Sequence, residues 1–115
     1  LADMVTQIEA SRALVHVAAQ KYDRGDADTA TFASMAKLHA TDLCMKVVTD
    51  ALQLTGGRGY LQDFPLERFF RDAKLNQIGE GASEVHKTVI GRDAVRRAAQ
   101  AERNPCLRAG PLTDY

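Results

Sequence analysis

The sequence has little that would mark a secreted, membrane or nucleic-acid-binding protein. Its 115 residues include no tryptophan, three prolines and two cysteines, and 15 Lys and Arg balance 15 Asp and Glu, so the formal charge is zero. A neutral chain lacks the attraction that drives nonspecific binding to nucleic acids and anionic membranes. With no apolar run of about 18 residues and no leader-like start, we expect neither a membrane span nor a signal peptide.

The residues that often build disulfides and metal sites are few and scattered. Cys44 falls in a helical pattern and Cys106 in a polar stretch near the end. Two cysteines in such different surroundings favour reduced thiols, and hence a protein of the cytoplasm, or of the mitochondrial matrix if the source is eukaryotic. The three histidines share no metal-ligand spacing with each other or with cysteine: His16, His39 and His86. We therefore predict no metal site.

What is present is the composition of one ordinary globular domain, with 45% apolar and 26% charged residues. From Leu1 to about Tyr22 the apolar residues recur every three or four positions and predict an amphipathic helix: Leu1, Met4, Val5, Ile8, Val15, Ala18, Ala19 and Tyr22. Because this pattern is already running at the first residue, which is not Met, the chain resembles a piece of a longer polypeptide.

The rest of the chain continues as helices separated by glycine-rich breaks. Residues 23–28 predict a turn, in which Gly25 can take positive φ, and about 27–55 predict a long helix with two apolar stripes. Further helices are expected at about 65–73 and 82–102. The fold class is all-α, an up-and-down helical bundle of three long helices and one short one, with a domain at 1–103 and a flexible tail at 104–115.

Two loops between these helices carry unusual residues. Gln53 to Tyr60 holds three glycines in four residues, which suits either a simple helix stop or close approach of a ligand to the backbone. Ile78 to Glu84 places Glu80 between two glycines, just before a helix. There it could act as an accessible general base, or it could merely offset the positive end of the helix dipole. Between them, Pro65 to Ala73 predicts two i,i+4 ion pairs, Glu67 with Arg71 and Arg68 with Asp72.

Read in order, these segments resemble the C-terminal helical domain of the acyl-CoA dehydrogenases. That family has a Gln-x-x-Gly-Gly-x-Gly-aromatic turn, a Pro-x-Glu-Arg helix that leads into Arg-Asp-Ala, and an Ile-x-Glu-Gly-Thr-Ser-Glu/Gln segment that opens the last long helix. The matching segments here are Gln53 to Tyr60, Pro65 to Ala73 and Ile78 to Glu84. The resemblance covers roughly residues 1–97.

The resemblance implies a role for each matching residue. Glu80 would be the base that removes the α proton of an acyl-CoA thioester while FAD accepts a hydride from the β carbon, and its backbone N–H would bind the thioester oxygen. Gln53, Leu54, Thr55, Gly56 and Gly57 would contact the FAD of a neighbouring subunit, and Ala82, Ser83 and Glu84 the FAD of the same subunit. Substrate contacts would come from Glu80, Gly81 and Arg92.

The chain departs from the family pattern in three ways. Ala82 replaces the usual Thr and removes a hydroxyl that could bind flavin or cap the last helix. Gly79 stands where many relatives carry Tyr, so we expect a bulky, branched or polycyclic acyl group to be preferred over a short straight one. The family's N-terminal domain, β-domain and first C-terminal helix have no counterpart, so these 115 residues alone are expected to bind FAD poorly and to be inactive.

The partners implied are an acyl-CoA, an electron-transfer flavoprotein or similar acceptor, and further copies in a dimer or dimer of dimers. An apolar stripe left open by the absent helix also predicts association of the chain with itself. Two alternatives remain: a flavin acyl-CoA oxidase or monooxygenase-like member, and a noncatalytic helical module that only oligomerises. The carboxylate at Glu80 disfavours the latter, because a scaffold does not need one there.

Overall fold

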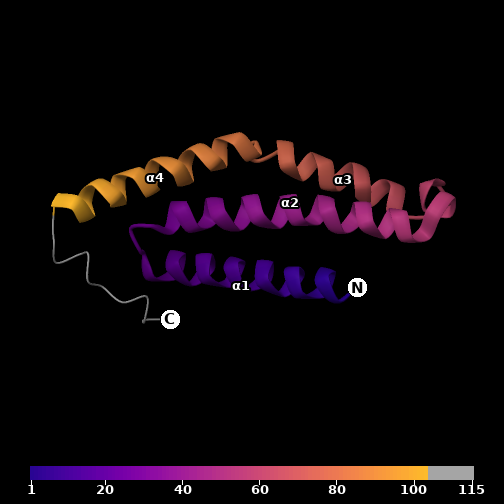
Figure 1. The fold of residues 1–115 in the computed structure, drawn as a ribbon, viewed down its shortest axis with the longest axis horizontal. Coiled ribbons are helices and arrows are strands. Elements are labelled where there is room, and N and C mark those ends of the chain that lie inside the picture. Colours follow the sequence, from indigo (N-terminus) through magenta and orange to yellow (C-terminus); the bar gives the residue numbers. More distant parts are fainter. Residues whose placement is uncertain (104–115) are drawn as a thin grey trace.

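The computed structural model describes residues 1–103 and consists of helices (Figure 1). They are α1 (Ala2–Arg24), α2 (Thr29–Thr55), the short 3₁₀ helix η1 (Gly56–Tyr60), α3 (Leu66–Ile78) and α4 (Ser83–Arg103). The predicted all-α class, with three long helices and a shorter one, is confirmed. The expected tail at 104–115, with Cys106, lies outside the described residues.

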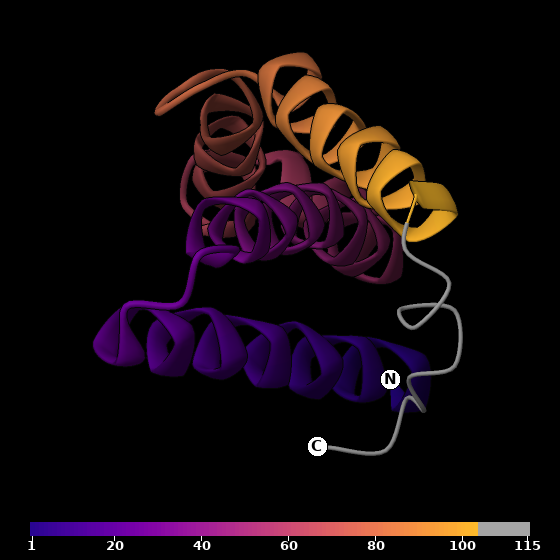
Figure 2. The same cartoon turned by 90° about the vertical axis from the view of Figure 1, so that its left-hand side faces the viewer.

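Helix α2 is the central element. Helix α1 packs on one side of it, and α3 and α4 follow one another along the other side (Figure 1). In the end-on view α1 crosses below α2 while α3 and α4 lie above it (Figure 2). The molecule is elongated, with extents of 59 × 27 × 25 Å. The two stripes expected on the second helix reflect this arrangement, since α2 has neighbours on two sides.

The turn between α1 and α2 forms as the sequence predicts at Gly25, which has φ 71° and closes α1 with hydrogen bonds from its N–H to the carbonyls of Lys21 and Tyr22. Asp28 occupies the N-cap position of α2, yet its carboxylate makes no capping hydrogen bond to the helix. Instead it accepts hydrogen bonds from Lys21 and Arg97. Ion pairing has therefore replaced capping at this position.

The buried core consists of small side chains at the helix crossings. Its apolar members are Ala18, Ala36, Leu43 and Ala73, the last only 1% exposed, and Ser11, Thr31 and Ser34 are buried with them. Small residues allow helix backbones to approach closely, so α1 meets α2 through Ser11 and Ala18. The larger apolar residues of the predicted α1 stripe are exposed rather than buried in this core: Leu1, Val5, Ile8, Val15 and Tyr22.

The segment after α2 differs from expectation in two respects. The glycines at 56–59 end α2, with Gly56 at φ 60°, but the chain then forms the 3₁₀ helix η1 that sequence reasoning missed. Helix α3 begins after Pro65 and runs to Ile78, five residues beyond the predicted end at Ala73. Nothing between Ala73 and Gly79 breaks a helix, so α3 continues to the glycine.

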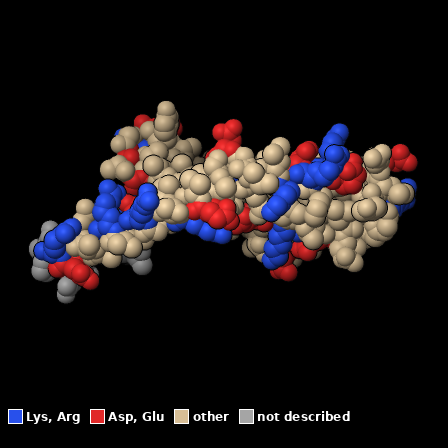
Figure 3. All heavy atoms as spheres, turned by 90° about the horizontal axis from the view of Figure 1, so that it is seen from above, with Lys and Arg blue, Asp and Glu red and all other residues tan. Residues whose placement is uncertain are grey.

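Charges of both signs are interspersed on the face that carries α3 and α4, in keeping with the zero net charge (Figure 3). No helix among residues 1–103 is both long enough and apolar enough to cross a membrane. Of the two ion pairs expected on α3, the one between Glu67 and Arg71 is confirmed, with Arg71 Nε 3.0 Å from Glu67 Oε2. The expected pair of Arg68 with Asp72 does not form; the Arg68 guanidinium lies over the ring of Phe69 instead.

An ion-pair network joins the C-terminal ends of α1 and α4. Lys21 Nζ lies 3.0 Å from Asp28 Oδ1, and Arg97 bridges Asp28 at 3.2 Å and the buried Asp93 at 2.7 Å. The hydrogen bond from Lys21, followed by that from Arg97, holds the pKa of Asp28 below its ordinary value. The pKa of Asp93 is lowered mainly by Arg96, with help from Thr31 and Arg97. Acid should therefore loosen this end of the molecule.

We expect Asp28→Asn to lower the melting temperature by several degrees at neutral pH and by much less at about pH 2. Because the folded-state pKa of Asp28 is depressed, its stabilisation is present above about pH 4, the pKa of an unfolded aspartate, and is lost as the pH falls through the folded value. Thermal unfolding, monitored by circular dichroism between about pH 2 and pH 7, measures the difference in melting temperature between the two proteins. Asp50→Asn is the control, since Asp50 forms no ion pair within residues 1–103. A pH-independent difference would contradict the prediction.

Candidate functional site

The loop between α3 and α4, residues 79–82, has an unusual backbone. Glu80 is the one non-glycine residue in the described part of the chain with positive φ, at 54°, and Gly81 follows at φ 90°. Left-handed backbone is unfavourable for residues that carry a Cβ, and such strain clusters at functional sites. Glu80, the candidate base, thus has a strained backbone conformation that contacts from other parts of the fold must stabilise.

That support comes from α2 and α4. Lys37 Nζ, on α2, donates a hydrogen bond to the Gly81 carbonyl oxygen at 2.6 Å, and His86 Nε2, on α4, lies 3.2 Å from the Glu80 carbonyl oxygen. A Cβ on Gly81 would lie 2.9 Å from His86 Nε2. The ring therefore packs directly against the loop, and only glycine fits there.

The two helices that flank the loop are joined to α2 by one carboxylate. Asp42 Oδ1 accepts a hydrogen bond from Gln77 Nε2, near the end of α3, at 2.7 Å. The same oxygen accepts a longer one, 3.4 Å, from the hydroxyl of Ser83 at the start of α4. Both ends of the loop are consequently fixed to α2 within about one turn of Lys37.

The functional groups of Glu80 itself remain available to a ligand. Its side chain is exposed, and no residue of 1–103 forms a hydrogen bond or ion pair with its carboxylate. Its backbone N–H likewise has no acceptor among these residues, whereas the N–H of Gly79 is bonded to the Leu75 carbonyl. A carboxylate and an N–H on one residue could remove a proton and bind a developing negative charge on the same ligand.

The backbone conformation at Gly79 does not require glycine. Its φ of −72° and ψ of 160° are open to any residue. A Cβ there would lie 3.4 Å from the Leu75 carbonyl oxygen, an ordinary contact. The fold would thus accept a side chain at position 79, and its absence leaves space beside Glu80.

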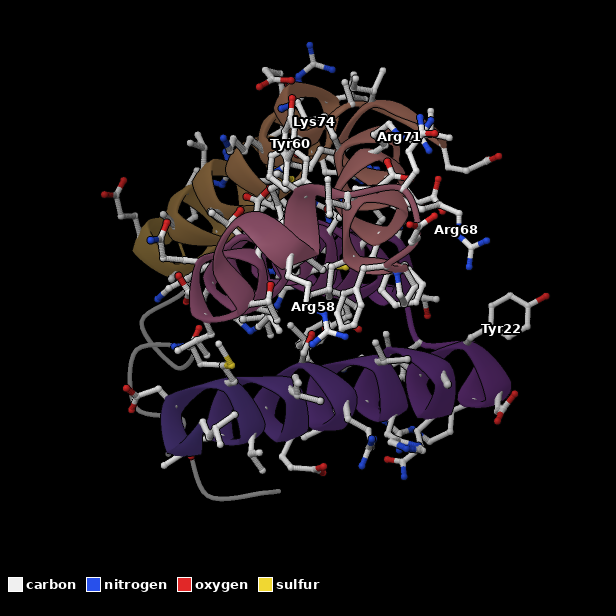
Figure 4. The ribbon with its side chains drawn as sticks, turned by 90° about the vertical axis from the view of Figure 1, so that its right-hand side faces the viewer. Tyr22, Arg58, Tyr60, Arg68, Arg71 and Lys74 are labelled. Carbon is white, nitrogen blue, oxygen red and sulfur yellow. The ribbon has the colours of Figure 1, made fainter. Side chains whose placement is uncertain are left out.

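The turn from Gln53 to Gly57 lies at the other end of α3. Gln53, Leu54 and Thr55 are exposed, and a Cβ on Gly56 or Gly57 would meet nothing within 4 Å. An open cleft of about 590 Å³ lies beside it, lined by residues that include Leu52, Tyr60, Phe70 and Arg71. Tyr60, Arg68 and Arg71 project from this end of the molecule (Figure 4).

The structure thus divides the predicted cofactor residues into two separate groups. Helix α3, with 13 residues, spans about 20 Å between the turn at 53–57 and the Glu80 loop. Ala82, Ser83 and Glu84 lie beside Glu80, although the Ser83 side chain is buried on Asp42 and only Glu84 is exposed. Arg92 is exposed on α4, about 13 Å beyond Ser83 along the helix.

Sequence reasoning missed the residues that support the loop. Lys37 and Asp42 lie more than 35 residues before Gly81 on a helix read only for its apolar stripes, and no local pattern connects them to it. The sequence offers no metal-ligand spacing for His86 and therefore no sign of its role from that pattern. Its position in the first turn of the helix that follows Glu80 was the one available signal.

An apolar groove also lies between α1 and α2, away from both loops. It has a volume of about 380 Å³, and its lining includes Ile8, Val15, Leu43 and Val48. It contains none of the predicted site residues, so the candidate chemistry is not there.

Comparison with known proteins gives consistent matches. The family model for the acyl-CoA dehydrogenase C-terminal domain matches residues 1–95. Cyclohexane-1-carbonyl-CoA dehydrogenase from Geobacter metallireducens is 52% identical over 99 residues, which cover 86% of this chain and 26% of that protein. The chain therefore spans about a quarter of the length of the curated relatives it matches.

Two solved structures share the fold. Butyryl-CoA dehydrogenase from Megasphaera elsdenii superposes with a TM-score of 0.78 at 46% identity, over 82% of this chain and 24% of that one. A chain in a structure described as the electron transferring flavoprotein of Acidaminococcus fermentans gives the same TM-score and identity, over 83% and 25%. Both matches extend over most of the chain described here.

Proposed function

Since the chain belongs to the acyl-CoA dehydrogenase family, as its C-terminal domain, we propose that it serves the α,β-dehydrogenation of an acyl-CoA thioester, with Glu80 as the base. A Glu80 Oε atom takes the proton from the carbon α to the thioester carbonyl, and the Glu80 N–H donates to the carbonyl oxygen as charge develops on it. The observation that carries the proposal is the strained, supported loop that leaves both groups of Glu80 free.

The residues present fit FAD as the cofactor, which supplies the acceptor for the hydride when bound. Gly56 and Gly57 leave the turn at 53–57 open to a large planar or phosphate-bearing group, and the exposed Gln53 can hydrogen-bond to it. At the other site, Glu84 and the backbone of Ala82 and Ser83 lie next to Glu80. Arg92, further along α4, would attract the anionic coenzyme A rather than touch the reacting carbons.

The separation between the two predicted flavin-binding segments, residues 53–57 and 82–84, supports a homo-oligomer. With about 20 Å of helix between them, one isoalloxazine ring cannot lie against both. We therefore assign the turn at 53–57 to the flavin of a second subunit and residues 82–84 to the flavin of the same subunit, in a homo-oligomer. The likeness to a chain in an electron transferring flavoprotein structure supports such a protein as the electron acceptor.

The substrate proposed is a bulky or alicyclic acyl-CoA. Gly79 leaves space beside Glu80 that the backbone does not demand, and a relative 52% identical is named for cyclohexane-1-carbonyl-CoA. A branched or ring-shaped carbon skeleton next to the thioester needs that width, whereas a straight chain does not.

Mixing acyl-CoAs with the flavin-loaded full-length protein that contains these 115 residues, in the absence of oxygen, tests the function and the substrate class together. We expect the flavin absorbance to bleach, faster with cyclohexane-1-carbonyl-CoA than with butyryl-CoA. Stopped-flow absorbance measures both rates, and Gly79→Tyr should reverse the preference. No bleaching by any acyl-CoA would refute the function, and a clear preference for butyryl-CoA would refute the substrate class alone.

A further inference from the structure

Two consecutive carbonyl groups in the Glu80 loop receive side-chain hydrogen bonds from two different helices. Lys37 reaches the Gly81 carbonyl from α2, and His86 reaches the Glu80 carbonyl from α4. In most loops such carbonyls are hydrated or bonded to nearby backbone. Here the peptide units on either side of Gly81 Cα are each held by a donor from outside the loop.

The Lys37 contact is a specific one. Its ammonium forms no ion pair within residues 1–103, and the acceptor it has there is the Gly81 oxygen at 2.6 Å, which is short for such a pair. The side chain is only partly exposed, so its stem crosses the surface of α2 to reach the loop. A charged donor is thus directed at one carbonyl rather than at a neighbouring carboxylate.

The surroundings of His86 define its tautomer. Its Nδ1 is buried and has no hydrogen-bond partner among residues 1–103, while Nε2 faces a carbonyl oxygen that can only accept. A proton on Nε2 satisfies this arrangement, because a proton on Nδ1 would be buried without an acceptor. His86 is therefore a fixed donor to the loop.

From these contacts we propose that Lys37 and His86 are positioning residues that hold the loop in its left-handed conformation and so aim the Glu80 carboxylate and N–H at the substrate. For its catalytic consequence this rests on the proposed function of Glu80. A left-handed φ at a residue with a Cβ persists only where neighbouring groups enforce it. Removing either hydrogen-bond donor should let the loop relax and shift the Glu80 carboxylate away from its position beside the substrate.

The test compares Lys37→Met, Lys37→Arg and Lys46→Met in the flavin-loaded full-length protein that contains these 115 residues. Lys46→Met is the matched control, since Lys46 is also on α2 but makes no hydrogen bond to any described residue. We expect Lys37→Met to slow substrate-driven flavin reduction about 10- to 100-fold, the usual cost of small misplacement, with acyl-CoA affinity, flavin content and melting temperature unchanged. Lys37→Arg should recover most of the rate. His86→Leu should resemble Lys37→Met, and His86→Gln, which retains an N–H donor, should be milder.

A second measurement separates positioning from the function itself. A Glu-specific protease cleaves after Glu80 only when the loop opens, so Lys37→Met should be cut there faster than Lys46→Met. Equal cleavage and equal reduction rates in these two variants would overturn the proposal, as would a lower rate matched by an equal loss of bound flavin. If the unchanged protein reduces no flavin, the proposed function fails, and the cleavage comparison alone decides the positioning role.

Discussion

Glu80→Gln is expected to slow substrate-driven flavin reduction by roughly 10²- to 10⁴-fold, the contribution typical of a general base. Glutamine keeps the shape of the side chain and the backbone N–H but cannot take up a proton at neutral pH. Since the Glu80 carboxylate contacts no other described residue, the substitution should leave the fold and the bound flavin intact. Anaerobic stopped-flow absorbance measures the rate, with flavin content and melting temperature as checks.

Glu102→Gln serves as the control for this experiment. Glu102 is an exposed glutamate near the far end of α4 with no hydrogen bond to a described residue, so its loss should leave the rate unchanged. If Glu80→Gln retained a rate within a few-fold of the control, Glu80 would not be the base. The family membership would stand in that case, because it does not depend on the role of this residue.

Gly59→Ala should lower the free energy of unfolding by about 1–3 kcal/mol, the cost of forcing extra atoms into a packed site. Gly59 is buried in η1, and a Cβ there would overlap Thr55 Oγ1 and lie 3.3 Å from Leu52 Cδ2. The Thr55 hydroxyl cannot simply rotate away, because it donates to the Leu52 carbonyl oxygen at 2.9 Å. Urea unfolding of the purified protein measures the change.

Gly57→Ala is the matched control for that prediction. It adds the same methyl group two residues earlier, at a position with ordinary φ where a Cβ would meet nothing within 4 Å. Its effect should stay within about 0.5 kcal/mol, as for most surface substitutions. Equal losses in the two variants would show that flexibility of the glycine run, rather than packing of Gly59, determines the stability of η1.

Local patterns in the sequence predicted the helices well, and the errors have physical causes. Gly25 and Gly56 mark the ends of α1 and α2 because each adopts the positive φ that glycine permits. Helix α3 is longer than predicted, because its charged pairs mark only residues 65–73, whereas the first residue that breaks the helix is Gly79. The apolar stripe of α1 was found, but its direction could not be predicted, since periodicity does not say which neighbour covers a face.

The candidate site was predictable only in part for the same reason. The motif placed Glu80 between two glycines before a helix, and the structure has it there. Its left-handed φ and its free N–H are properties of the folded loop. The α2 residues that contact the loop and its flanking helices, Lys37 and Asp42, lie far from it along the chain, so no local pattern reveals their proximity.

Because α2 lies between α1 on one side and α3 and α4 on the other, its length limits where residues can be inserted into this chain or deleted from it. One residue inserted between Asp42 and Gln53 would turn everything after it by about 100° and shift it by about 1.5 Å. Lys37 and Asp42 would then no longer share a register with the turn at 53–57. Insertions and deletions should be tolerated at residues 61–65, outside the helices, but not within this stretch of α2, which sets the spacing between the two sites.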